Sequence, residues 1–317
     1  MWRREGQVVT DRRAGMDHDL YEYSALPSRR PYSWPNGARI ALRVVVYLDY
    51  WELAPPAESV QAPDVQGPWP VIPPDYRTHS YREYGSRVGI FRLLDLLEEL
   101  NIRATLAVGA AACERYAFVV KLCQSRGWEL AAHGTHATRM VTSMMSEDDE
   151  KLVIQEAITA IEAVSGVSPR GWIAQDYGES VRTPHLVAEA GLEYIGDWPN
   201  DEQPYFMTAG GGRLVSLPAQ PEWDDVELLW IRQLPTTKYP TVVNDAFRRL
   251  YADAEHGARM LTLALHPWLI AQPHRFPYLK EAIARIACEP GVWAATSTEV
   301  AQAFAEVAPT AGAGASE

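Results

Sequence analysis

The chain has 317 residues, 47% of them hydrophobic, and its 29 basic and 41 acidic residues give a formal net charge of −12. This length and hydrophobic content fit one domain of the size of an α/β barrel. An acidic surface repels phosphate backbones, so we expect no nucleic-acid partner. The three cysteines, Cys113, Cys123 and Cys288, show no C-x-x-C spacing, which is typical of ordinary thiols in a reducing compartment.

The ends of the chain differ from its middle in composition. Residues 1–36 are polar and contain proline, and they predict an arm that packs on the body. Residues 37–307 then form a single domain, and residues 308–317 are predicted to be a disordered tail. The N-terminus has no apolar core of signal-peptide length, and the chain has no run of about 18 apolar residues. Both observations predict a cytoplasmic protein without membrane association.

Strands and helices alternate along the domain. A β-branched run over 38–48 predicts the first buried strand. The proline-rich stretch 51–79 predicts a long loop, either a lid or an interface with another subunit. Further strands are expected at 103–108, 128–132, 171–173, 192–196, 228–232, 261–265 and 292–295. Helices are expected at 87–100, 110–126, 147–165 (with Ser146 as the N-cap), 183–190, 244–256, 277–288 and 298–307. This alternation predicts a parallel α/β barrel, with an open doubly wound sheet as the alternative.

Three titratable residues each come directly after a predicted strand: Asp49, His133 and His266. The carboxyl ends of parallel barrel strands converge on one face, so we expect these side chains to share a pocket. A carboxylate there can act as a general base or a metal ligand, and histidines suit acid–base work near neutral pH. The structural alternatives are a capping aspartate and buried core histidines.

A second set of residues near strand ends provides candidates for substrate binding: Glu83, Trp172, Asp197, Trp198 and His274. Tryptophans at these positions wall pockets or simply pack at a barrel rim. The acids and His274 bind substrate, or they form ion pairs and turns. No Gly-x-Ser-x-Gly elbow or phosphate-binding loop occurs, which argues against a serine hydrolase and a nucleotide-binding protein.

Four short segments carry a resemblance to a known family: Arg82–Gly89, Ala132–Gly134, Leu265–Pro267 and Gly191–Tyr194, which precedes Asp197. Over roughly residues 30–305 the chain resembles the polysaccharide deacetylase (NodB-homology) superfamily. It is most similar there to the branch of cofactor-independent allantoinases and cyclic-imide hydrolases. The resemblance implies a distorted (β/α)7 barrel, hydrolysis of an amide-type C–N bond, and a homo-oligomer.

The resemblance assigns Asp49 as the first-strand acid, with His133 and His266 as motif histidines. Arg170 and Trp172 fall where the third motif is expected. The superfamily's deacetylases usually carry a second acid beside the first and a second histidine four residues after the first. Here Tyr50 and Ala137 occupy those positions.

The metal requirement therefore has two alternatives. One is Zn2+ or another divalent metal bound by Asp49, His133 and His136, with His79 as a substitute for His136. The other is catalysis without a metal.

The sequence thus predicts a hydrolase that opens a small cyclic amide, imide or ureide. Asp49 is the expected base, His133 polarises the carbonyl, and His266 protonates the leaving nitrogen. One alternative is a metal-dependent deacetylase of polysaccharides or N-acetylated sugars. A second alternative is a non-catalytic relative that keeps the barrel as a binding module.

Overall fold

The computed structural model describes residues 17–61 and 72–308. Their strands form one curled sheet in the order β6-β7-β5-β4-β3-β2-β1-β8, with β9 also paired to β1. The strand pairs in these residues are parallel except for β6 with β7. The strands are β1 Ile40–Leu48, β2 Thr105–Val108, β3 Glu129–Ala132, β4 Gly171–Trp172, β5 Tyr194–Ile195, β6 Tyr205–Phe206, β7 Val215–Ser216, β8 Arg259–Leu265 and β9 Val292–Ala295.

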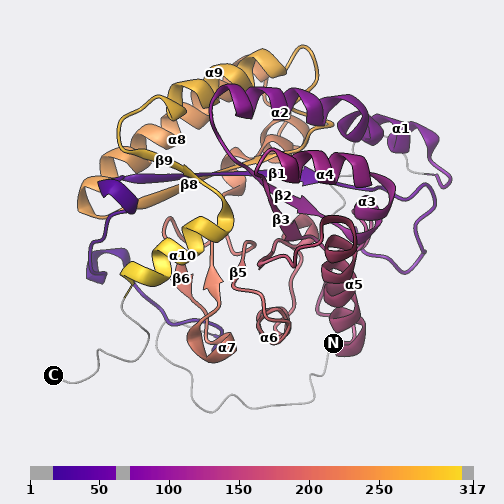
Figure 1. Ribbon diagram of the computed structural model, residues 1–317, viewed down its shortest axis with the longest axis horizontal. Coiled ribbons are helices and arrows are strands. Elements are labelled where there is room, and N and C mark those ends of the chain that lie inside the picture. Colours follow the sequence, from indigo (N-terminus) through magenta and orange to yellow (C-terminus); the bar gives the residue numbers. More distant parts are fainter. Residues whose placement is uncertain (1–16, 62–71, 309–317) are drawn as a thin grey trace, which may run out of the picture.

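Most of the helices surround this sheet (Figure 1). The α-helices are α1 Tyr76–Tyr84, α2 Ile90–Glu99, α3 Ala110–Arg115, α4 Ala117–Ser125, α5 Glu147–Ser165, α6 Thr183–Glu189, α7 Ala209–Gly212, α8 Tyr239–Asp253, α9 Phe276–Ala287 and α10 Ser297–Val307. The curled, mainly parallel sheet inside helices confirms the predicted distorted (β/α) barrel. In the described part of the chain, no helix is both long and apolar enough to cross a membrane.

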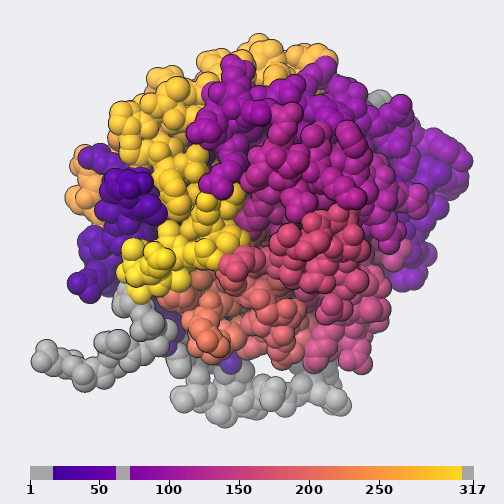
Figure 2. Space-filling view, in the orientation of Figure 1, coloured from indigo at the N-terminus to yellow at the C-terminus, as the bar shows by residue number. Residues whose placement is uncertain are grey.

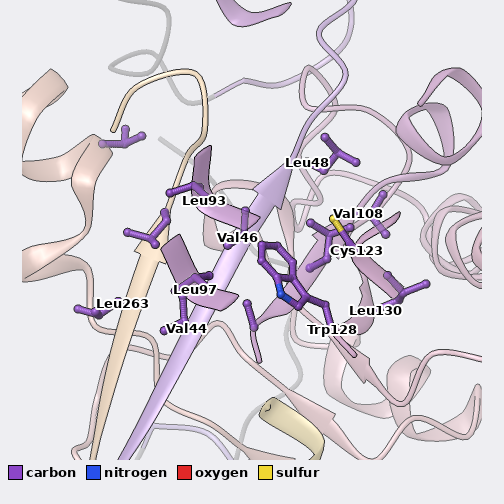
Figure 3. Packing of buried hydrophobic residues seen from close by; sticks show 14 of the residues in the cluster. Val44, Val46, Leu48, Leu93, Leu97, Val108, Cys123, Trp128, Leu130 and Leu263 are labelled. Carbon is purple, nitrogen blue, oxygen red and sulfur yellow. The ribbon is translucent and has the colours of Figure 1, made fainter. Parts of the chain in front are cut away.

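Strand β1 is buried along its whole length, as its continuous apolar run predicts. Side chains alternate between the faces of a strand. On one face, Val44, Val46 and Leu48 pack in the larger core cluster with the outer helices. Figure 3 shows these residues beside Leu93 and Leu97 of α2. On the other face, the odd-numbered residues of β1 point into the barrel, where a second cluster lies. Inner and outer faces can therefore be assigned by residue number.

The barrel does not close by strand pairing between β8 and the strands at the other end of the sheet. Instead, the Gln220 side chain bridges the gap, since its amide donates to the Met260 carbonyl and its oxygen accepts from the Thr262 N–H. The Met260 N–H also donates to the Glu202 carbonyl at 3.0 Å. One buried glutamine thus supplies hydrogen bonds to β8 where it has no strand partner on this side among the described residues.

Helix α10 covers the end of the barrel where the parallel strands begin. Its Ser297 accepts a hydrogen bond from the buried Arg43 guanidinium, and Thr298 binds the Glu129 carboxylate. Figure 2 shows α10 (yellow) beside the N-terminal described residues (indigo), where the rings of Tyr32 and Phe304 are in contact. The opposite end, where the parallel strands finish, is left for a pocket.

Several expected elements differ from the structure. Residues 228–232 were predicted as a strand, but Glu227–Ile231 is a π-helical turn, because a short apolar run does not distinguish a strand from a buried helix. The predicted helix 110–126 is broken at Tyr116 into α3 and α4. The loop was predicted to extend to residue 79, but α1 begins at Tyr76, after the Asp75 N-cap.

Other parts of the expected organisation were confirmed, missed or left outside the structure. Ser146 caps α5 as predicted, with its side chain accepting from the Asp149 N–H. The short elements β6, α7 and β7 were not expected. Residues 1–16 of the predicted arm, 62–71 of the loop and 309–317 of the tail lie outside the described residues.

Candidate active site

Asp49, His133 and His266 each lie one residue beyond a parallel strand, on the inner face of the barrel. Tyr47 of β1, Ala131 of β3 and Ala264 of β8 belong to the inner core cluster. Each candidate is two residues further along the same strand direction, so its side chain points the same way. All three line one cavity. The convergence expected from the sequence is present in the structure.

Asp49 and His133 come from strands that are separated by β2. Leu48 is level with Val108, and Val108 with Ala132, so Gly109 lies between the two residues. Neighbouring strands are about 4.8 Å apart, so the backbones of β1 and β3, with β2 between them, are too far apart to be in contact. A Cβ added to Gly109 would lie 3.0 Å from the Thr135 carbonyl oxygen, so glycine there lets the segment after His133 pack closely. His133 Nε2 lies 3.3 Å from Asp49 Oδ1.

The partners of His133 fix how its ring is used. Its Nδ1 lies 2.5 Å from the Ile173 carbonyl oxygen, which can only accept, so Nδ1 carries a hydrogen. His133 Nε2 and Asp49 Oδ1 are both buried, and the geometry between them is not that of a hydrogen bond. Burial alone lowers the pKa of His133, but the Asp49 carboxylate outweighs it and the net pKa is raised. Burial likewise acts to raise the pKa of Asp49, and His133 reverses this, so the pKa is lowered.

His266 is held by a buried carboxylate that the sequence did not single out. Its Nδ1 lies 2.6 Å from Asp225 Oδ1, and its backbone N–H donates to Asp225 Oδ2 at 2.9 Å. Burial acts to lower the pKa of His266, but the charges of Asp225, Asp224 and Asp49 raise it to about 9. The imidazole is therefore protonated at neutral pH, and its Nε2–H is available to the cavity.

Tyr47 separates the two histidines. Its ring stacks on His266 with a 4.5 Å centroid distance and a 3° interplanar angle, and it lies 5.2 Å from the His133 ring. Burial raises the pKa of Tyr47 well above its ordinary value, so the phenol stays neutral. Tyr47 therefore limits the rotation of His266 without adding a charge.

A buried guanidinium forms part of the wall. The Arg82 Cζ atom lies 3.4 Å from the ring centroid of Trp268, 4.4 Å from Trp51 and 5.4 Å from Trp230. Arg82 is 5% exposed, and burial lowers its pKa to about 9. It remains a cation at neutral pH, held between aromatic faces.

Glycines in the π-helical turn Gly85–Gly89 allow this wall to form. A Cβ added to Gly89 would lie 2.1 Å from the Pro267 carbonyl oxygen, and one added to Gly85 would lie 2.8 Å from the Trp268 nitrogen. The turn therefore packs directly on the segment that follows His266. The glycines of the Arg82–Gly89 segment serve close packing.

The cavity has a volume of about 190 Å³. The lining contains the Asp49–His133 pair and His266 together with aromatic and acidic side chains: Tyr47, Asp49, Trp51, Arg82, His133, Ala174, Gln175, Asp176, Tyr177, Pro221, Asp224, Val226, Glu227, Ile231, His266 and Trp268. Buried cavities of about 150 Å³ hold one benzene-sized molecule. The volume thus suits a single small ring.

The structure places the predicted substrate-binding residues away from this cavity. Glu83 lies 3.8 Å from His79, Trp172 is fully buried in the core, and Asp197 accepts from the Ala174 N–H. Trp198 packs on Tyr21 and His274 is exposed. None of the five lines the cavity.

The expected metal ligands are not assembled either. His136 does not line the cavity and lies 3.9 Å from Glu52, while His79 Nδ1 lies 2.9 Å from the Trp51 carbonyl oxygen. Within residues 17–61 and 72–308, one other group offers metal donors within 4.8 Å of one another: Asp224, Asp225 and His266.

The carboxylate oxygens of Asp224 and Asp225 already accept hydrogen bonds within the protein. Asp225 binds His266 through both oxygens. Asp224 accepts from the Val226 N–H and from the Tyr177 hydroxyl. A metal bound through His266 Nδ1 would break the hydrogen bond between this atom and Asp225. The donor set therefore fits a histidine-positioning role better than a metal site.

Asp225 and Arg82 were missed as site residues for different reasons. Asp224-Asp225 stands in an irregular stretch before the wrongly predicted strand 228–232, and only the adjacent acids were a signal. The charged run Arg82-Glu83…Arg87 suggested an internal ion pair with Glu83, whereas the Arg82 guanidinium lies against tryptophan rings.

Comparison with known proteins agrees with this geometry. The polysaccharide deacetylase family model matches residues 83–195. The solved structure of Puue allantoinase has a TM-score of 0.82 and 26% identity, covering 93% of this chain and 99% of its own. Residues 83–195 thus match a polysaccharide deacetylase domain, and the chain is similar to this superfamily over most of its length. It therefore falls among hydrolases of non-peptide carbon–nitrogen bonds.

Two further proteins are similar to this chain over most of its length. The structure of a probable polysaccharide deacetylase from Pseudomonas aeruginosa PAO1 has a TM-score of 0.78 and 26% identity, covering 87% of this chain and 94% of its own. A Schizosaccharomyces pombe protein named "Putative polysaccharide deacetylase" is 29% identical, covering 87% of this chain and 93% of its own.

Proposed function

We propose that the protein hydrolyses a small cyclic amide, imide or ureide and opens its ring. The observation that carries this proposal is the small, partly open pocket of about 190 Å³, with Asp49, His133 and His266 in its wall. A polymer substrate needs an extended cleft, whereas this volume accommodates one small ring. The likeness to Puue allantoinase, over 99% of that chain, supports the same choice.

The proposed chemistry uses the two histidine–carboxylate pairs in different roles. Asp49 has a lowered pKa and is ionised, so it takes a proton from a water that attacks the ring carbonyl. His133 has a raised pKa, and its Nε2–H stabilises the negative charge that develops on the carbonyl oxygen. Tyr47 keeps the two imidazoles apart.

His266 completes the reaction as the general acid. Its pKa of about 9 keeps Nε2 protonated at neutral pH, and Asp225 orients the ring through Nδ1. When the carbon–nitrogen bond breaks, His266 gives its proton to the leaving nitrogen. The water oxygen ends in the new carboxylate, and the nitrogen stays attached to the rest of the opened ring.

A second candidate is a metal-dependent deacetylase of N-acetylated sugars or polysaccharides. The family model and the clustered donors of Asp224, Asp225 and His266 favour it. Bound zinc there would polarise the acetamide carbonyl as a Lewis acid. The hydrogen bonds already made by both carboxylates weigh against this candidate.

The deciding experiment is an assay of purified protein on allantoin, hydantoin and succinimide, with and without prior treatment with a chelator. The proposal expects ring opening of at least one compound, with no loss after chelation. Acetate release from an N-acetylated sugar that requires a metal, without ring opening, would establish the second candidate instead.

A further inference from the structure

We propose that Arg82 and Asp176 recognise the substrate by forming hydrogen bonds to one C=O and one N–H on the same edge of its ring. This inference rests on the proposed ring-opening function and names the feature that selects the substrate. Both residues line the cavity, and each charge acts on the other. Arg82 donates to the carbonyl oxygen, and the Asp176 carboxylate accepts from the N–H.

Arg82 is held as a flat donor. Its guanidinium carbon lies 3.4 Å from the Trp268 ring centroid and 4.4 Å from that of Trp51. Stacking occupies the faces of a guanidinium, and its N–H groups point outward in the plane. The same tryptophans provide apolar walls for a flat ring. This arrangement suits a planar carbonyl acceptor beside an aromatic surface.

Asp176 is held at the cavity by an unusual backbone conformation. Asp176 and Tyr177 both have positive φ values, 50° and 56°, which non-glycine residues rarely adopt. The Tyr177 hydroxyl donates to Asp224 Oδ2 at 2.8 Å and so ties this turn to the pair that holds His266. Such strain persists where surrounding contacts impose it, often at binding sites. The catalytic roles assigned to Asp49, His133 and His266 leave Asp176 without a function.

The charged surroundings of Asp176 fit an acceptor for an N–H group. Burial raises its pKa most, and Asp49 adds to this, while His133, His266 and Arg82 act in the opposite direction. A small ring forces its amide to be cis, so C=O and N–H lie on one edge. An acyclic acetamide is trans and places them on opposite edges. A guanidinium and a carboxylate that face the same cavity therefore favour a ring over an acetylated sugar.

The test compares kcat/KM for hydantoin and 1,3-dimethylhydantoin, which has no ring N–H. If the wild type opens only imides, succinimide and N-methylsuccinimide replace them. We expect the wild type to prefer the unmethylated ring by at least about 10-fold, since a site built to bind an N–H discriminates strongly. Asp176→Gly keeps the left-handed turn and should bring this ratio close to one.

Two further variants sharpen the result. Asp176→Asn retains an oxygen acceptor and should keep most of the preference. Arg82→Lys loses the planar donor set and should raise KM about 10-fold for both rings, with a smaller change in kcat. The matched controls are Arg87→Lys and Asp95→Asn, which change exposed residues outside the cavity.

An unchanged preference in Asp176→Gly, with ring opening intact, would overturn the inference while the proposed function stands. Absence of ring opening by the wild type would overturn the proposed function, and this inference with it.

Discussion

Asp225 binds His266 twice, through the ring Nδ1 at 2.6 Å and through the backbone N–H at 2.9 Å. The carboxylate therefore fixes the position of the residue as well as the tautomer and charge of its ring. Asp225 is fully buried, so its negative charge is little screened by water. His266, the proposed acid of the reaction, therefore depends on Asp225 for its position and its charge.

Asp225→Asn should shift the alkaline limb of the pH–rate profile. His266 acts while protonated, so wild-type activity is expected below its pKa of about 9 and is lost as the pH rises through that value. Removing the adjacent charge lowers the pKa of His266 by about 1–3 units. A profile of kcat/KM against pH measures the shift. An alkaline limb that does not move would show that His266 is not the acid.

The acid side of the same profile reports on Asp49. Because its pKa is lowered, the carboxylate stays ionised until the pH falls below its usual range near 4. Activity should therefore persist into mildly acidic conditions. Asp49→Asn should lower kcat by at least about 100-fold, as expected for loss of a general base. Asp95→Asn, on the exposed side of α2, is the control and should be unaffected.

His136 is expected to be dispensable for catalysis. It lies outside the cavity, near Glu52, and burial is the main cause that lowers its pKa. His136→Ala and chelator treatment should each change kcat/KM by less than about 3-fold, whereas His133→Ala should lower it by about 100-fold or more. Metal content and activity measured on the same samples check this. A parallel loss of metal and activity in His136→Ala would contradict it.

Gly89→Ala should destabilise the wall of the cavity. The added Cβ would lie 2.1 Å from the Pro267 carbonyl oxygen, next to His266, and backbone atoms must move to relieve this contact. Overpacking of this kind costs about 1–3 kcal/mol or more. Thermal unfolding together with kcat/KM measures the effect. Val88→Ala, at the exposed neighbouring position, should leave both close to wild type.

The sequence predicted the parts of the site that follow regular strands. Asp49, His133 and His266 could be placed together because β1, β3 and β8 have clear apolar patterns and parallel strands end at one face. Asp225 and Asp176 could not be placed, because they lie in irregular segments whose positions depend on long-range contacts. The Tyr177–Asp224 hydrogen bond, between residues far apart in sequence, is one such contact.

The substrate-binding residues show a second limit. Trp172 and Asp197 are near strand ends, as expected, yet Trp172 is in the core and Asp197 binds the Ala174 backbone. One residue of register decides whether a strand-end side chain faces the cavity or the core. Arg82 could not be predicted as a wall residue because its tryptophan neighbours come from three separate segments.

The most direct test of the account is the rate of ring opening by the chelator-treated wild type, compared with Asp49→Asn, on allantoin, hydantoin and succinimide. The account predicts that the wild type opens at least one of these rings after chelation and that Asp49→Asn is at least about 100-fold slower. A wild type that opens none of them, but releases acetate from an N-acetylated sugar only with a divalent metal, would contradict it.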